Sequence, residues 1–162
     1  MKNFQNKSKI VKVSKILRNI AFAGLVLLGI MIPVSLAAAL PIFFVKGLSF
    51  SLAQFMAIPM FVFAFITNLK IFRFFDRLKD GFFFDAQTVG NLNAAANWWL
   101  VLWLYEVMQY VLMQQFWNHP HDFSLYHFPP DAGGLCAALT LKFVAWFFRE
   151  AQELQEEQEL TV

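Results

Sequence analysis

Residues 68–93 read N-L-K-I-F-R-F-F-D-R-L-K-D-G-F-F-F-D-A-Q-T-V-G-N-L-N, and this stretch decides the fold because it is the only long charge-rich segment inside the chain. It separates two strongly apolar halves, and its flanks, residues 48–69 and 94–117, are each long enough to cross a bilayer as a helix. Its basic residues are Lys70, Arg73, Arg77 and Lys79. A positive cluster between two apolar spans is typical of a cytoplasmic connector, so this stretch predicts the membrane topology.

The composition of the whole chain points to a lipid environment. Of the 162 residues, 59% are hydrophobic and only 15% are charged, whereas about a quarter of an average soluble domain is charged. A soluble protein of this size has too small a core to bury that much apolar surface. The single cysteine, Cys136, excludes an internal disulfide and a C-x-x-C site. The basic clusters flank apolar spans and no nucleic-acid-binding motif is present, so we expect no direct contact with nucleic acid.

The apolar segments predict four membrane-spanning helices, at about residues 21–45, 48–69, 94–117 and 132–148. Lys and Arg together number six before the first span, one between the first two, four in the connector and none between the last two, and Arg149 follows the fourth. By the positive-inside rule, both termini and the connector then lie in the cytoplasm. We therefore predict an all-α, four-helix transmembrane bundle in a bacterial inner (cytoplasmic) membrane, with helices that extend into the cytoplasm.

This topology divides the chain into a basic cytoplasmic segment (residues 1–20), a four-span membrane domain (21–149) and an acidic cytoplasmic helical tail (150–162). The basic segment is either a solvated anchor, which we favour, or a short helix on anionic headgroups. A cleavable signal peptide is an alternative, because a basic start, an apolar run and Ala37-Ala38-Ala39 are typical of one. The apolar run exceeds the roughly 7–15 residues of a signal core, which favours an uncleaved helix.

Local helix signals mark the two ends of the connector. Lys70, Arg73 and Arg77 stand at positions i, i+3 and i+7, so they share one face of a helix that continues beyond the second span. Asp80-Gly81 predicts the end of that helix. Asp85 is expected to be the N-cap of the next helix, which runs into the third span.

Three features together resemble a family of small bacterial membrane proteins that is catalogued only as a domain of unknown function. They are the motif R-L-K-D-G-F-F-F-D-A-Q-T-V-G-N-L at residues 77–92, the four-span layout, and the ending F-R-E-A-Q-E-L-Q-E-E-Q-E-L-T-V at residues 148–162, in which E-L-T-V is the most specific signal. Members of the family are often encoded beside small helix-turn-helix regulators, so the resemblance implies, by analogy, a membrane partner for a cytoplasmic regulator. The family defines no catalytic residues, and the histidine-bearing outer loop of this chain departs from its pattern.

Two charged residues lie inside the predicted spans. Glu106 is about halfway along residues 94–117 and Lys142 is a little past the middle of residues 132–148, so antiparallel helices would bring both near the membrane midplane. An unpaired Lys there costs about 2.5–3.5 kcal/mol on insertion scales, which favours a pair. The pair could serve an ion or proton relay. Alternatively, it fixes helix register, or Glu106 is neutral and Lys142 extends to the cytoplasmic side.

A second candidate site is a pair of charged stripes at the cytoplasmic ends of the second and fourth spans. The residues are Lys70, Arg73 and Arg77 on one helix and Glu150, Glu153 and Glu157 on the other. Their matching spacing on parallel helices predicts facing rows that a partner or a phospholipid could separate. Exposed charge pairs are weak and screened by salt, so solvated charge on both helices is the alternative interpretation.

The loop between the third and fourth spans holds His119, His121 and His127, and histidine is a common metal ligand. Their spacing matches no zinc signature, so we favour ordinary loop histidines and predict no cofactor.

The sequence lacks the common catalytic motifs. No P-loop, H-E-x-x-H, G-x-S-x-G or haem-ligation motif is present, so we do not expect an enzyme. The favoured function is a small regulatory or accessory membrane protein that offers a charged cytoplasmic surface to a protein partner. The alternative is a transporter or channel component that uses the layer of Glu106 and Lys142. The sequence makes no prediction of the oligomeric state.

Overall fold

The computed structural model describes the backbone of residues 2–46, 48–116 and 132–160, and the side chains of residues 8–38, 40, 56–112 and 132–158. Within these ranges the chain forms four helices and no strand: α1 (Lys2–Lys46), α2 (Leu48–Lys79), α3 (Ala86–Phe116) and α4 (Ala132–Leu160). The predicted all-α fold is confirmed. The basic start of the chain and the acidic end belong to the same continuous helices as the apolar stretches beside them.

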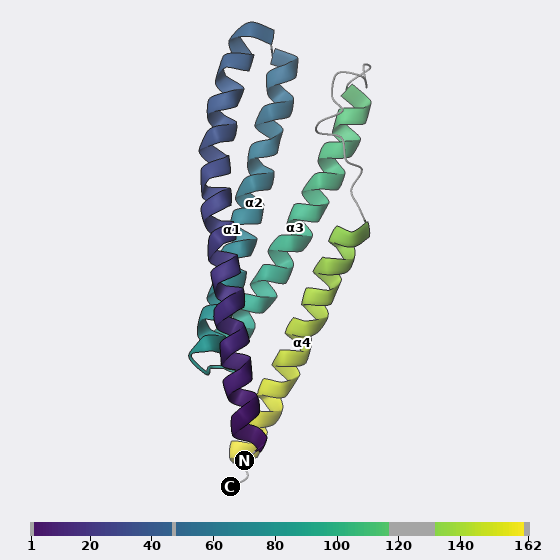
Figure 1. Cartoon of the computed structure of the whole chain (residues 1–162). Coiled ribbons are helices and arrows are strands. Elements are labelled where there is room, and N and C mark those ends of the chain that lie inside the picture. The colour runs from purple at the N-terminus through teal and green to yellow at the C-terminus, as the bar shows by residue number, and fades with distance from the viewer. Residues whose placement is uncertain (1, 47, 117–131, 161–162) are drawn as a thin grey trace.

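The helices run alternately in opposite directions. The α2–α3 corner, which we define as residues 80–85 with the helix ends on either side, therefore lies at the same end of the molecule as the start of α1 and the end of α4 (Figure 1). Over the described residues, the large packing interfaces are those between α1 and α2, between α2 and α3, and between α3 and α4. One cluster of buried apolar side chains lies near the corner and is formed by Phe74, Leu78, Leu92 and Ala145. Helices α2 and α4 also touch there, because the ring centroids of Phe74 and Phe148 are 5.9 Å apart.

Three of the helices are long and apolar enough to cross a membrane, at Ser8–Ala38 in α1, Met56–Lys79 in α2 and Ala132–Gln158 in α4. In the most apolar stretch of each of these helices, only 6–11% is buried inside the molecule. Large apolar side chains therefore face outward; Leu27 on α1 is 65% exposed and Phe143 on α4 is 64% exposed. An apolar surface of this extent is unfavourable in water and favourable in lipid, which identifies a membrane protein.

Helix α3 is not among the helices that are apolar enough to cross a membrane over the described residues. It packs against both α2 and α4, with Ala95 and Ala96 fully buried. The hydroxyl of Tyr105 donates a 2.6 Å hydrogen bond to the carbonyl oxygen of Met56 on α2. The third span, residues 94–117, stays a prediction, as do the boundaries of the three parts of the chain.

Candidate functional site at the α2–α3 corner

The corner begins where α2 ends, at a glycine that the backbone requires. Gly81 has a φ of 90°, in the left-handed region that residues with side chains disfavour. Its N–H donates to the carbonyl oxygen of Leu78 at 3.1 Å, and the N–H of Phe82 donates to that of Arg77 at 3.2 Å. This pair of bonds is a Schellman motif, which satisfies two carbonyl groups at a helix end. The helix end predicted at Asp80-Gly81 is confirmed.

Asp85 caps the first turn of α3, which confirms its predicted role. Its Oδ1 accepts hydrogen bonds from the backbone N–H of Thr88, at 3.1 Å, and from the Thr88 hydroxyl. Thr88 is fully buried, and its hydroxyl also lies 3.0 Å from the carbonyl oxygen of Phe82. A hydroxyl carries one proton, so the Asp85 carboxylate and the Phe82 carbonyl share this donor. The cap therefore holds the connecting loop against the start of α3.

An ion pair joins the end of α2 to this cap. Nη2 of Arg77 donates to Oδ2 of Asp85 at 2.5 Å, and the guanidinium lies 5.0 Å from the centroid of the Phe82 ring. Partial burial acts to raise the pKa of Asp85, but the hydrogen bonds from Thr88 and Arg77 outweigh it and hold the pKa below its ordinary value. Both side chains of the pair are 30% exposed, so solvent screens part of their attraction.

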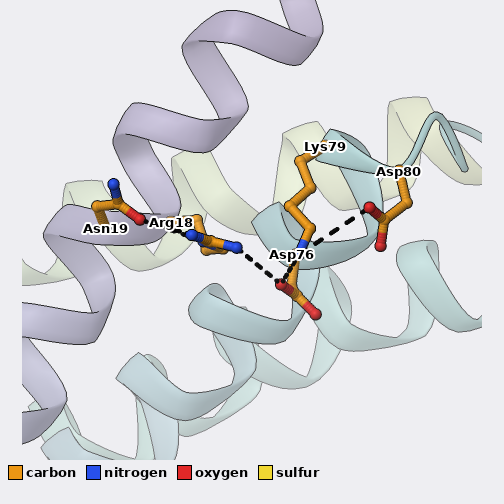
Figure 2. A network of polar contacts seen from close by, with 5 residues as sticks. All are labelled: Arg18, Asn19, Asp76, Lys79 and Asp80. Atoms are coloured by element: carbon orange, nitrogen blue, oxygen red, sulfur yellow. Dashed lines mark hydrogen bonds and ion pairs between the residues drawn. The ribbon is translucent and has the colours of Figure 1, made fainter.

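A second polar network connects α1 with the end of α2 (Figure 2). Oδ1 of Asp76 accepts a 2.7 Å bond from Nζ of Lys79 and lies 3.7 Å from Nη1 of Arg18 on α1. Lys79 also lies 4.0 Å from Asp80, and Arg18 donates to Oδ1 of Asn19 at 2.8 Å. Partly exposed pairs of this kind are worth about 0–1 kcal/mol each. The network therefore orients α1 beside the corner and adds only modest stability.

A groove of about 400 Å³ opens between the first turns of α3 and the middle of α4. The polar and aromatic side chains along it include Asn93, Lys142, Trp146 and Arg149. Nζ of Lys142 donates to Oδ1 of Asn93 at 2.8 Å, which links the two helices. Gly90 also lines the groove, and a Cβ atom there would meet no atom within 4 Å. The groove thus has open space beside two cationic side chains.

The position of Lys142 contradicts its predicted pairing with Glu106. Glu106 is half-buried on α3, thirteen residues beyond Asn93, which corresponds to about 20 Å along the helix axis. A lysine that is bonded at the level of Asn93 does not reach that far. The prediction was wrong because it assumed that both spans are centred at the same depth, whereas α4 is shifted along α3 toward the corner.

The two predicted charge stripes are not paired with each other at Arg77 and Glu153. Arg77 is bonded to Asp85 within the corner, and Glu153 accepts a 3.0 Å bond from Arg149 on its own helix. The prediction of facing stripes is therefore wrong for these two residues. The other members lie on the expected helices, with Lys70 half-buried and with Arg73, Glu150 and Glu157 exposed.

The three loop histidines, His119, His121 and His127, lie outside the described residues. The hypothesis of a metal site therefore stays a prediction.

Sequence reasoning missed the Arg77–Asp85 pair and the groove beside Lys142. The first had a usable signal, because an Arg in the last turn of one helix and an Asp cap on the next lie close together when the loop is short. The second had a weaker one. Gly90 and Asn93 share a face of α3, and Lys142 and Arg149 share a face of α4. Nothing in the spacing says that these two faces meet.

Residues 34–162 match the model of a family described as "Protein of unknown function (DUF2975)". The matched part includes the corner, the groove and the acidic end of α4. No curated protein and no solved structure matches the chain. The family match confirms the predicted resemblance to a family of unknown function.

Proposed function

This chain belongs to the DUF2975 family of proteins of unknown function, and we propose that it is a non-enzymatic accessory or regulatory protein of the bacterial inner membrane that binds a cytoplasmic protein. In this proposal the corner and the nearby helix ends face the cytoplasm, as the distribution of Lys and Arg favours. The acidic end of α4 is the surface that the partner contacts.

The observation that carries the proposal is the continuity of α4. It runs as one helix from its apolar stretch, which ends at Phe148, to Leu160. Four acidic side chains on the described part of this extension are exposed, namely Glu150, Glu153, Glu156 and Glu157. Leu154 lies among them and is 59% exposed. An ordered acidic helix that also presents an apolar residue suits a partner with a basic surface and an apolar contact. DNA-binding regulators have basic surfaces of this kind.

Transport was the alternative function, and it depended on a polar layer of Glu106 and Lys142. Lys142 is bonded to Asn93, which lies about 20 Å along α3 from Glu106, so this basis is lost. Among the described residues, no arrangement favours transport over partner binding.

A photoreactive amino acid in place of Leu154 tests the proposed contact in native membranes. Ultraviolet irradiation of cells that carry the full chain should link position 154 to a cytoplasmic protein, which mass spectrometry identifies. The same amino acid in place of Leu27, which is 65% exposed on the apolar part of α1, is the control and should give no such adduct. An identical protein adduct from both positions would contradict a specific contact at α4.

The charge requirement is tested in the same assay by changing the four exposed acids to Gln: Glu150, Glu153, Glu156 and Glu157. Gln keeps the helix propensity of Glu, so α4 should persist. We expect about a tenfold loss of adduct, because four exposed contacts worth about 0.3–0.5 kcal/mol each are removed and about 1.4 kcal/mol corresponds to a factor of ten. The matched control changes three exposed basic residues of α1 to Gln and should retain the adduct: Lys9, Lys12 and Lys15. If the adduct were retained both after the four Glu→Gln changes on α4 and after the three Lys→Gln changes on α1, an acidic docking surface would be rejected.

A further inference from the structure

The groove between α3 and α4 lies at a defined depth in the molecule. On α4 the apolar stretch ends at Phe148, and an acidic sequence follows Arg149. Just before that boundary, Trp146 and Phe147 are 55% and 60% exposed. Exposed aromatic side chains, and Trp in particular, favour the headgroup level of a bilayer. Trp146 also lines the groove, so in a bilayer we expect the groove to open at the headgroup level.

Two cationic side chains of α4 line the groove. Lys142 and Arg149 are seven residues apart, so they share a helix face and are separated by about 10 Å along its axis. Asn93 takes one of the three Nζ hydrogens of Lys142. Glu153 accepts from Nε of Arg149, which leaves the two Nη groups of the guanidinium as further donors. No acidic residue lines the groove within the described part of the chain.

Gly90 keeps the groove open. Glycine inside a helix is unfavourable relative to alanine, so its presence usually has a packing reason. No packing reason is present here, because a Cβ atom at position 90 would meet no atom within 4 Å. A larger side chain at this position would instead occupy the space beside Lys142 and Arg149.

We propose that this groove binds the phosphate of an anionic phospholipid. Lys142 and Arg149 donate to the phosphate oxygens, while the acyl chains lie along the exposed apolar part of α4. Three features together favour this class of ligand: two cations that keep further N–H donors, open space beside them, and a position next to the end of the apolar stretch of α4. The assignment to the cytoplasmic leaflet rests on the orientation proposed above, but the site itself requires no protein partner.

Native mass spectrometry of the purified full-length protein, with added phosphatidylglycerol or phosphatidylcholine of identical acyl chains, tests the proposal. The wild type should retain phosphatidylglycerol in preference to phosphatidylcholine. Lys142→Gln combined with Arg149→Gln should weaken that binding by about thirtyfold, because each basic residue near an anionic headgroup contributes about fivefold. Gly90→Leu should weaken it by filling the groove, with both cations still present.

The control for charge combines Lys9→Gln with Lys12→Gln, which removes two exposed cations from α1 and should leave binding unchanged. Circular dichroism establishes that each variant keeps its helix content. The charge variant removes the two cations, whereas Gly90→Leu fills the groove. If one of these variants fails to fold, the other still tests the proposal. Equal retention of both lipids by the wild type, or full binding by the correctly folded variants, would overturn the proposal.

Inorganic phosphate separates a lipid headgroup from a soluble phosphate compound. We expect that millimolar inorganic phosphate leaves bound phosphatidylglycerol in place, because the acyl chains contribute to its binding. Displacement of the lipid by inorganic phosphate alone would overturn the assignment to a lipid. The crosslinking at position 154 reports on the protein partner, so failure of one proposal is distinguishable from failure of the other.

Discussion

Gly81 and Gly90 lie close together in the chain but are under opposite constraints. Gly81 has a φ of 90° at the end of α2, where a side chain costs about 1–2 kcal/mol. Gly90 lies inside α3, and a Cβ atom there meets open space. Gly81→Ala should therefore lower the free energy of unfolding by about 1 kcal/mol, whereas Gly90→Ala should raise it by about 0.5–1 kcal/mol. Thermal melting of both variants in one detergent checks this, and equal shifts of the same sign would contradict it.

The carboxylate of Asp85 should make stability depend on pH. Its pKa is held below the ordinary value of 3.8 in the folded protein. A group with a depressed folded pKa stabilises the protein above its unfolded pKa, and this contribution is lost as the pH falls through the folded pKa. Asp85→Asn should therefore lower stability at neutral pH, by up to about 1 kcal/mol for a pair that is partly exposed.

The difference in melting temperature between Asp85→Asn and the wild type should shrink as the pH falls below 3.8. Asp80→Asn is the control, because its carboxylate is 55% exposed and lies 4.0 Å from Lys79. It should change stability little at any pH. A difference for Asp85→Asn that stays constant into the acid range would show that its charge does not stabilise the corner.

At the scale of elements, α1 and α2 are joined by a hydrogen bond within their apolar parts. Nδ2 of Asn68 donates to the carbonyl oxygen of Ala21 at 3.0 Å. Gly24 makes room for this contact, since a Cβ atom there would lie only 2.5 Å from Nδ2 of Asn68. Hydrogen bonds between helices in lipid are worth about 0.6–1.7 kcal/mol. This contact therefore helps to set how α1 and α2 align.

Gly24→Ala should displace the Asn68 amide and lower the free energy of unfolding by about 0.6–1.7 kcal/mol. Asn68→Ala removes the same bond, so the double variant should lose less than the sum of the two single losses. Gly29→Ala is the matched control, because its Cβ atom would make an ordinary contact 3.9 Å from Phe65. Unfolding in a detergent series measures all four variants. Additive losses, or an equal loss in the control, would argue against the contact.

At the scale of the whole molecule, the alternating helices bring the start of α1 and the end of α4 to one end (Figure 1). If α3 crosses the membrane as well as the other three helices, the chain crosses four times. Green fluorescent protein fused after Val162 should then fluoresce in the cytoplasm, and alkaline phosphatase inserted at Leu125 should be active in the periplasm. Phosphatase activity after Val162 would reverse the orientation on which the partner proposal depends.

The amino-acid sequence by itself determined the features that depend on neighbouring residues. The apolar stretches of α1, α2 and α4, the helix end at Gly81 and the cap at Asp85 each follow from a few consecutive side chains. The fold class and the location of the corner were therefore predictable from the sequence, as was the family resemblance.

Only the tertiary structure decided which distant residues meet. Lys142 bonds to Asn93 and not to Glu106, and Arg77 bonds to Asp85 while Glu153 bonds to Arg149 on its own helix. The physical reason is that two antiparallel helices can shift along each other, and each turn of shift moves a residue by about 5.4 Å. Packing of the buried side chains selects that shift, and with it the groove where Lys142 and Arg149 lie.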